Sequence, residues 1–593
     1  MAERYYIMYD PLTFNLMDKV GQAGFGPGDL AGYLSGTNGE QLSERNYLDF
    51  LRFDLEKERA GVLDHWAMDS YSCHYVGNQI ALASPESRVI LADGKRRTLA
   101  GIIEEEGAKP AAVFITSITS NFPTAVAASI ALNYAGIPVI IGGVHVSSSP
   151  QDVERYIRNH VPHPELVSEV HGPGDSQVVR AILADLRDGG LKKEYCGRVT
   201  IEDGVWGADN VVPMPKLKPL FFRKLPLIGD WLSEITRVNI IAPYLGCPYS
   251  CKFCSMSSLP QEQRKFTARS PADFVEELGS FQKDGARLSN RFFLFLPENL
   301  ILGGKHLEET LDLIIQRDLK VSYATQISIE VAQKDRLLEK LRASGATHFF
   351  IGLESLDIRN LEWIGKHAVG DIKKSGLGVA EYYSRQIRKI ASYGISVNGA
   401  FIFGLPYDYF NSPQDHSGRD VAEFCVRERI GIQATSLNDL PGSENFTESQ
   451  TNGRCLYGRQ GSMDYLLALC TGDLAETNRL PPGSLKNSPL VVAYLVWDAI
   501  HRVCSRLGRI SLASAWNGWR APTKNGRLGT AERIRDSLGA VGFQMAIATF
   551  RDIARSLAQS RNGSRGTFRR LYEREKSQEV LAMLGDWVAR FDD

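Results

Sequence analysis

The chain has 593 residues, of which 43% are hydrophobic and 23% charged, and its formal net charge at pH 7 is −1. This length exceeds what one hydrophobic core supports, so we expect several domains of ordinary globular composition. A net charge near zero gives no general attraction to polyanions, which argues against nucleic acid or an anionic lipid surface as a partner. The first residues are charged and lack an apolar segment, so we expect no secretory signal.

Nine cysteines are too few for a disulfide scaffold in a chain of this size. Six of them are scattered, whereas Cys247, Cys251 and Cys254 lie close together. This usage predicts a reducing, cytoplasmic location, with the three clustered thiols serving a metal or catalysis.

Residues 1–105 show a mixed pattern, and we treat them as a separate N-terminal region. Residues 106–195 follow as strand, helix and strand, with the runs AAVFITSI, TAVAASIALNYA and PVIIGGVHV, and then the helical run SQVVRAILADLRD. This alternation is typical of a parallel sheet and predicts a Rossmann-like α/β domain. The stretch 111–145 has no Asp, Glu, Lys or Arg, but Asn, Pro and Gly interrupt it at positions that favour a folded unit over a membrane span.

Residues 196–235 are expected to form an extended linker, since four prolines and four basic residues lie between 211 and 228. From residue 236 to 450, six strand-like runs alternate with helical ones, beginning with RVNIIAPY and ending with GIQATSL. Six βα units predict a partial (β/α)6 barrel. Residues 451–593 are helical in pattern, and their tryptophans fill a core or, alternatively, belong to a lid over the barrel mouth.

The segment GCPYSCKFC, residues 246–254, spaces its cysteines as C-x3-C-x2-C directly after the first strand-like run of the barrel. Thiolates favour iron and sulfide, so three of them on one loop can ligate three irons of a cubane and leave the fourth open. Zinc is the alternative, although no second Cys pair or His follows at finger spacing. Active-site groups of such barrels lie at the C-terminal ends of strands, where this loop begins.

This loop resembles the cluster-binding loop of the radical S-adenosylmethionine (SAM) superfamily. The resemblance implies a 4Fe-4S cluster ligated by Cys247, Cys251 and Cys254, whose open iron binds the amino and carboxylate groups of SAM. Reduction of such a cluster cleaves SAM into methionine and a 5′-deoxyadenosyl radical. The resemblance also implies a flavodoxin-like or other low-potential reductant as a partner.

Later segments resemble strand-end elements of the same family, in order along the chain. Residues 297–299, Pro-Glu-Asn, end the second strand, where paired Asp is the usual form. Residues 352–355 resemble the GxES element after the fourth strand, and Gly365-Lys366 its usual follow-on. The resemblance implies a SAM site with these members: Phe253, Glu298, Gln326, Ser328 and Glu354. Each carboxylate taken alone could equally be a solvated or salt-bridged group.

Tyr323 lies in the third strand-like run, where a period of two points it opposite to Ser322 and Ala324. It is either a catalytic residue that approaches the substrate or a tyrosine of the core.

Residues 106–187 resemble the cobalamin-binding domain that precedes the barrel in one radical SAM subgroup. Small and hydroxyl-bearing residues follow each strand and let a flat or phosphate-bearing ligand approach the backbone, although nucleotide and flavin domains share this feature. The resemblance implies cobalamin contacts at Ser117, Thr119, Ser120, Gly142, Gly143, His145, Gly172 and Gly174. The region lacks a D-x-H-x-x-G motif, so His145 is either a cobalt ligand of another kind or a turn histidine bonded to backbone.

Three functions remain open at this point. The first is a cobalamin-dependent radical SAM methyltransferase acting on an unactivated carbon of a small-molecule or peptide natural-product intermediate. The second is an enzyme of the same architecture that closes or rearranges a ring without methyl transfer, and the third is a non-enzymatic iron–sulfur or corrinoid sensor. Methyl transfer yields S-adenosylhomocysteine, whereas rearrangement yields 5′-deoxyadenosine without it.

Overall fold

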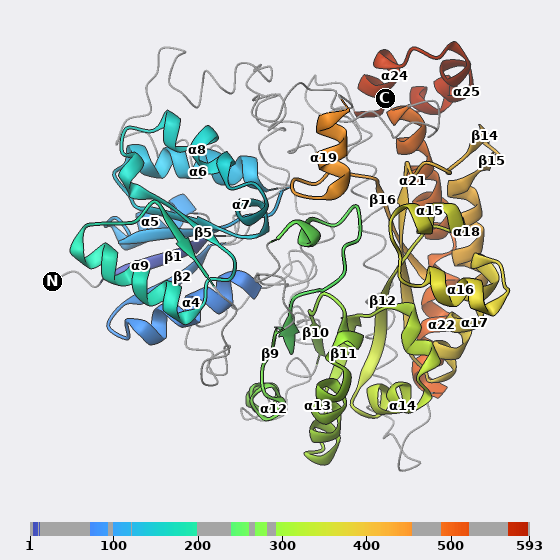
Figure 1. Cartoon of the computed structure of the whole chain (residues 1–593), viewed down its shortest axis with the longest axis horizontal. Coiled ribbons are helices and arrows are strands. Elements are labelled where there is room, and N and C mark those ends of the chain that lie inside the picture. The colour runs from blue at the N-terminus through green and yellow to red at the C-terminus, as the bar shows by residue number, and fades with distance from the viewer. Residues whose placement is uncertain are drawn as a thin grey trace, which may run out of the picture.

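The computed structural model describes residues 4–9, 11, 71–92, 99–119, 121–197, 239–259, 267–281, 292–452, 488–520 and 567–590. Two six-stranded sheets form its two halves (Figure 1). Of the predicted linker, only Cys196 and Gly197 fall within these ranges. No helix in the described ranges combines the length and apolar composition that a membrane span requires.

The first sheet has the strand order β2-β1-β3-β4-β5-β6, and every neighbouring pair is parallel. Its strands are β1 (Tyr5–Tyr9), β2 (Arg88–Ala92), β3 (Ala112–Thr116), β4 (Val139–Gly142), β5 (Val167–His171) and β6 (Glu194–Cys196). Short continuous apolar runs such as AVFIT in β3 suit strands that are buried on both faces. The Rossmann-like parallel sheet is therefore confirmed.

Helices cover both faces of this sheet and bury a separate core on each. One face packs against α5 (Leu99–Glu106), α6 (Phe122–Tyr134), α7 (Val144–Ser148) and α8 (Gln151–Tyr156). The other face packs against α4 (Tyr71–Ala83) and α9 (Ser176–Asp188). The predicted helical run SQVVRAILADLRD is α9, which begins where the Asp175 side chain accepts from the backbone N–H groups of Gln177 and Val178.

The predicted domain boundary at residue 105 falls inside this sheet. Strands β1 and β2 both precede it, and β1 pairs with β2 on one side and β3 on the other. The described part of residues 1–105 thus contributes β1, β2, α4 and nearly all of α5 to the Rossmann-like domain. Local periodicity could not show this, because YYIMY is a short isolated run whose partner β3 lies more than a hundred residues further along the chain.

The second sheet has the strand order β16-β13-β12-β11-β10-β7 and is also parallel throughout. Its strands are β7 (Asn239–Ile241), β10 (Phe292–Phe295), β11 (Ser322–Gln326), β12 (Ala346–Glu354), β13 (Ser396–Phe403) and β16 (Gly431–Ser436). Each strand coincides with one of the six predicted strand-like runs, and only β12 begins one residue earlier than its run. The partial barrel is therefore confirmed.

Helices between these strands cover the outside of the barrel (Figure 1). They are α12 (Pro271–Ser280), α13 (Gly304–Gln316), α14 (Asp335–Ala343), α15 (Ile358–Trp363), α16 (Val369–Ser375), α17 (Val379–Ser392) and α18 (Ser417–Glu428). In α14 the buried residues Leu337, Leu338 and Leu341 recur at helical spacing and face the common core.

The C-terminal region packs helices onto the last strands of the barrel. Helix α19 (Glu444–Thr451) ends the barrel region, and the described helices of the C-terminal region are α21 (Pro489–Cys504), α22 (Leu507–Arg520), α24 (Thr567–Arg574) and α25 (Gln578–Ala589). Helix α21 lies against α18 and β16, and Trp587 is buried beside Tyr494 with ring centroids 5.0 Å apart. Trp516, by contrast, is 57% exposed, so core packing accounts for only part of the tryptophans.

We expect Gly143→Ala to destabilise the first domain far more than Gly136→Ala. Both glycines have positive φ, at +110° and +69°, which costs an L-residue about 1–2 kcal/mol. A Cβ at Gly143 would also overlap the Ser117 carbonyl oxygen, whereas nothing lies within 4 Å of one at Gly136. The overlap adds about 1–3 kcal/mol, which thermal unfolding should show as a larger fall in Tm. Equal effects of the two substitutions would contradict this packing.

Candidate functional site

The three clustered cysteines lie on the loop after β8 (Tyr244–Leu245), at the C-terminal end of β7. All three are partly exposed and outside any disulfide among the described residues. Burial raises the pKa of the Cys251 thiol to about 11, although the nearby Lys366 ammonium has the opposite effect and lowers this pKa. The other two cysteines also interact electrostatically with Cys251, so the loop gathers the thiols as the sequence predicts.

The spacing of the sulfur atoms bears on which metal they could hold. Two thiolates on one zinc ion, each at about 2.3 Å from it, lie at most about 4.6 Å apart. The cysteine Sγ atoms do not all lie within 4.8 Å of one another, since Glu169, His171 and Glu194 alone among the described residues meet that limit. A cluster in which each thiolate binds its own iron fits the wider spacing.

Two later segments of the barrel hold this loop. The backbone carbonyl of Lys252 accepts from the Asn445 N–H at 3.1 Å, and its Nζ lies 2.6 Å from Glu448 Oε1. Tyr249 lies over His367 with ring centroids 3.6 Å apart. Contacts from α19 on one side and from the segment after α15 on the other therefore fix the loop between them.

Glu354 forms a buried ion pair with Lys366 beside the cysteines. Lys366 Nζ lies 3.0 Å from Glu354 Oε1, and the two side chains are only 16% and 8% exposed. Burial lowers the pKa of the Lys366 ammonium, but the Glu354 carboxylate more than offsets this and the pKa is raised. A Cβ at Gly352 would overlap the Glu354 carboxylate, so glycine is needed beneath the pair.

Lys366 is not among the predicted site residues, although the Gly365-Lys366 pair after the GxES element was a signal for it. The structure places its ammonium close enough to Cys251 to affect the pKa of that thiol. Lys366 thus joins the candidate site.

Two carboxylates beside the loop keep an oxygen free of hydrogen bonds. Burial raises the pKa of Glu298, whose carboxylate also accepts from the Gly246 N–H. The Oε2 atoms of Glu298 and Glu330 are buried and have no hydrogen-bond partner among the described residues. Glu330 acts electrostatically on both Tyr249 and Lys366. Buried acceptors without donors call for an explanation, and a ligand with N–H groups would supply it.

The remaining predicted SAM residues lie at the same edge of the sheet. Phe253 is partly buried against the barrel core, and Gln326 ends β11. Asn299 joins the second strand end to the third, because its Oδ1 accepts from the Ser328 N–H at 3.0 Å. The structure therefore places Gln326, Ser328 and Asn299 at the C-terminal ends of neighbouring barrel strands, the edge at which the cysteine loop begins.

Tyr323 lies in the barrel core. Its side chain has no exposed surface, its ring stacks on Phe295 with centroids 4.0 Å apart, and its hydroxyl lies 2.8 Å from Ser344 Oγ. Of the two alternatives, this placement supports the core tyrosine and not the predicted catalytic role. The period-two pattern showed that Tyr323 faces away from its neighbours but not which face is inside.

The predicted cobalamin residues gather at the C-terminal edge of the first sheet. The Ser117 N–H donates to the Gly142 carbonyl at 2.8 Å, and the His145 N–H donates to the Ser117 carbonyl at 3.2 Å. The Gly172 N–H donates to Ser147 Oγ at 2.9 Å. These bonds join the loops after β3, β4 and β5 into one surface. Gly174 follows in the same loop, against Val76 of α4, and Ser120 lies outside the described residues.

His145 is completely buried under this edge. Its Nδ1 lies 3.3 Å from Thr119 Oγ1, its Nε2 lies 3.3 Å from Asp152 Oδ2, and its ring stacks on Phe122 at 3.9 Å. Side chains therefore close the ring in on every side, and Nε2 faces Asp152 without a hydrogen bond; this complete burial does not support a direct contact of the ring with cobalt. The alternative was a turn histidine bonded to backbone. The main-chain N–H of His145 does bond to backbone, but its ring contacts side chains.

Ile118 is a feature of this edge that the sequence interpretation missed. It lies between Ser117 and Thr119 and is 51% exposed, one of few large apolar side chains so exposed in the described ranges. Its place in a serine- and threonine-rich loop hid it, because exposure cannot be seen in the pattern. An exposed apolar group beside glycine backbone suits the face of a flat ligand.

The edge of the first sheet meets the cysteine loop. Helix α7, which follows Gly143, contacts the short helix η4 (Ser255–Ser258), which follows Cys254. Phe446 of α19 is buried in the core of the first domain, while its neighbour Asn445 bonds the cysteine loop. Figure 1 shows α7 and α19 between the two halves. Groups held at the two edges would therefore face each other.

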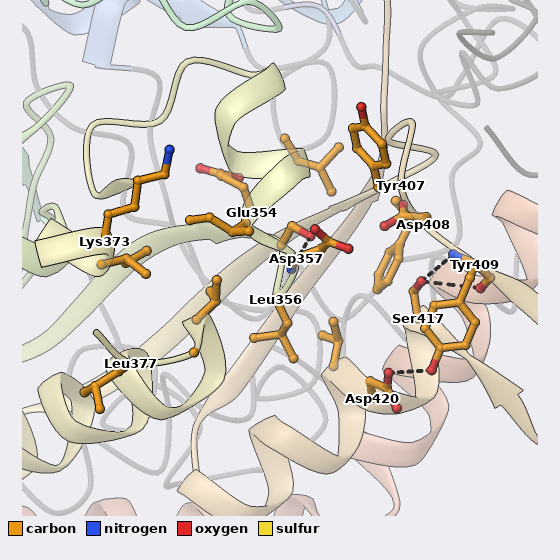
Figure 2. A pocket seen from close by; sticks show the side chains of 18 residues that line it. Glu354, Leu356, Asp357, Lys373, Leu377, Tyr407, Asp408, Tyr409, Ser417 and Asp420 are labelled. Atoms are coloured by element: carbon orange, nitrogen blue, oxygen red, sulfur yellow. Dashed lines mark hydrogen bonds between the residues drawn. The ribbon is translucent and has the colours of Figure 1, made fainter. Parts of the chain in front are cut away.

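A pocket of about 430 Å³ is lined by Glu354 and by residues of α16, α17 and α18. Figure 2 shows Asp408 and Tyr407 at its upper end and the Tyr409 hydroxyl bonded to Asp420. Burial raises the pKa of Asp408 to about 7, and its carboxylate accepts from the Gly404 and Leu405 N–H groups. The pocket thus borders the turn after β13 and shares Glu354 with the predicted SAM site.

Comparisons with known proteins agree with this geometry. A family model described as the radical SAM superfamily matches residues 241–416. The chain is 23% identical over 325 residues to bacteriochlorophyllide d C-8(2)-methyltransferase of Chlorobaculum tepidum, covering 54% of this chain and 63% of that protein. It is 25% identical over 229 residues to hopanoid C-2 methylase of Rhodopseudomonas palustris, covering 37% and 40%. In both cases it spans less than two thirds of the relative's length.

Among solved structures, the radical SAM methyltransferase TsrM of Kitasatospora setae, with cobalamin and a 4Fe-4S cluster bound, is similar over 92% of this chain and 100% of that one. The TM-score is 0.50 and the identity 11%, so the likeness shows a shared fold.

We expect Lys366→Met alone, or Glu354→Gln alone, to lower the free energy of unfolding by about 3–5 kcal/mol, because each leaves a buried partner charge uncompensated. The double variant should cost less than the sum of the two. The surface pair Lys373–Glu362, 62% and 41% exposed, is the matched control and should contribute about 1 kcal/mol at most. Denaturant unfolding of the six variants measures both cycles, and equal coupling in the two pairs would contradict the buried arrangement.

Proposed function

We propose that the chain is a cobalamin-dependent radical SAM enzyme that transfers a methyl group to an unactivated carbon, since residues 241–416 match the radical SAM family model. The observation that carries this proposal is the contact between α7 and η4. It brings the glycine-rich edge of the Rossmann-like sheet against the cysteine loop, so two cofactors held at these edges would share one reaction space.

In this proposal Cys247, Cys251 and Cys254 ligate a 4Fe-4S cluster, and SAM binds beside it. A bound cluster supplies the electron that cleaves SAM, and cobalamin supplies the carrier for the methyl group. The free Oε2 atoms of Glu298 and Glu330 are acceptors suited to an ammonium group such as that of SAM. The buried pair of Lys366 and Glu354 holds the floor of the site next to the thiolates.

Cobalamin would lie on the edge formed by the loops after β3, β4 and β5. Glycines at 142, 143 and 172 keep side chains out of the way of a flat ligand, and Ile118 offers it an apolar surface. His145 holds the edge from beneath, through Thr119 and Asp152.

The names of the two relatives support methyl transfer to carbon, since one is a C-8(2)-methyltransferase and the other a C-2 methylase. The substrate we propose is a small-molecule or peptide natural-product intermediate, and a low-potential reductant, such as a flavodoxin-like protein, supplies the electron. We place the reaction in the cytoplasm, where the free cysteines stay reduced.

The first test is cofactor content of protein made with cobalamin supplied and purified without oxygen. We expect about four irons and about one corrin per chain. Replacing Cys247, Cys251 and Cys254 by Ala should abolish the iron and leave the corrin, because the two sites lie on different sheets. Ile118→Glu should lower the corrin and leave the iron, and Cys196→Ala, at an exposed thiol of the first domain, should change neither.

Iron without corrin in the unaltered protein would reject the cobalamin part of the proposal and keep the radical SAM domain. Iron retained in the triple Cys variant would reject the cluster site itself. If both cofactors bind, S-adenosylhomocysteine formed on turnover supports methyl transfer, and 5′-deoxyadenosine without it indicates a ring-forming or rearranging enzyme.

A further inference from the structure

A second group of metal-ligating side chains lies in the first sheet, on the edge strand β6 and its neighbour β5. Glu169 and His171 are two residues apart on β5, so they share a face of the sheet. Glu194 of β6 is the register partner of Glu169. One ligand atom from each of the three lies within 4.8 Å of the others. None of them takes part in the proposed methyl-transfer site.

The charges in this group do not balance. Two carboxylates directly opposite on neighbouring strands repel each other. Arg158 Nη1 lies 2.9 Å from Glu169 Oε1 but also 3.4 Å from Glu154, and Lys193 pairs with Glu154 at 2.9 Å. Arg158 and Lys193 thus pair with Glu154 and Glu169, and among the described residues no ion pair reaches Glu194, whose negative charge lies uncompensated beside Glu169.

The buried carboxylate also has an open ligand position. Glu169 is 3% exposed, and its Oε2 has no hydrogen-bond partner among the described residues. His171 Nε2 lies 3.6 Å from this oxygen, which is too far for a hydrogen bond. Two ligands of one tetrahedral ion, each about 2.0–2.2 Å from it, lie roughly 3.4 Å apart. The separation therefore suits a shared ion better than a direct bond.

We propose that Glu169, His171 and Glu194 bind a divalent first-row metal ion, with zinc as the best fit to one imidazole and two carboxylates. Arg158 holds Glu169 by its other oxygen, as outer partners of metal ligands do, and the exposed Glu194 leaves a path for the ion. The ion ties the edge strand β6 to β5 just before the loop of Gly172. It offsets the excess negative charge and satisfies Glu169 Oε2.

The test is zinc binding by the holoprotein, with its iron–sulfur cluster reconstituted so that Cys247, Cys251 and Cys254 are occupied. Equilibrium dialysis against Zn2+ is followed by elemental analysis per chain. Loss of a ligand in His171→Ala or in Glu194→Gln should weaken zinc binding at least about tenfold. Because the Glu194 side chain is exposed, misfolding of Glu194→Gln would not explain such a loss. The matched control is His163→Ala, because His163 pairs with Glu165 on the surface of the same domain, where the two are 49% and 67% exposed.

Zinc should also raise the Tm of the unaltered protein and of the His163 variant, and not that of the other two. Zinc affinity and Tm shifts that are the same in all four proteins would overturn the proposal. Zinc binding that is lost when Cys247, Cys251 and Cys254 are replaced by Ala, but kept in His171→Ala, would also overturn the proposal. These outcomes leave the iron and corrin contents unaffected, so they are separate from the test of the proposed function.

Discussion

The contact between helix α7 and the short helix η4 is the interaction on which the proposed site depends. Parallel strands place all their C-terminal loops at one edge of a sheet, and this chain has two such sheets with those edges opposed. Helix α19 joins them. Ser443 caps it by accepting from the Phe446 N–H, Asn445 bonds the cysteine loop, and Phe446 is buried in the first domain's core. A shift of α19 would therefore move both edges.

The site contains buried polar groups that the folded chain alone does not satisfy. An unpaired buried oxygen is unfavourable by about 1–3 kcal/mol, and Glu298 and Glu330 each contribute one. The Lys366–Glu354 pair is stable only while both partners are present. A ligand that brings N–H donors and a metal that binds thiolates would satisfy these groups. The open oxygens of Glu298 and Glu330, next to a loop of three thiols, therefore fit residues that serve binding as well as packing.

The sequence predicted what depends on local pattern. The C-x3-C-x2-C spacing and the alternation of strand and helix are local signals, and the cysteine loop and all six barrel strands lie where they were expected. Membership of β1 and β2 in the first sheet depends on pairing across a long stretch of chain, which periodicity does not report. The direction in which a side chain points could not be predicted from the pattern either. Tyr323 proved to face the core, Ile118 is exposed, and His145 is closed in by side chains.

The most direct test of the central claim is electron paramagnetic resonance of protein that holds both cofactors. Three spectra are recorded. The first is of cob(II)alamin alone, bound to the triple Cys variant; the second is of the reduced cluster alone; and the third is of protein that holds both. If the two edges hold the cofactors against each other across α7 and η4, the combined spectrum will show magnetic interaction and differ from the sum of the separate ones. A combined spectrum equal to that sum would contradict the account.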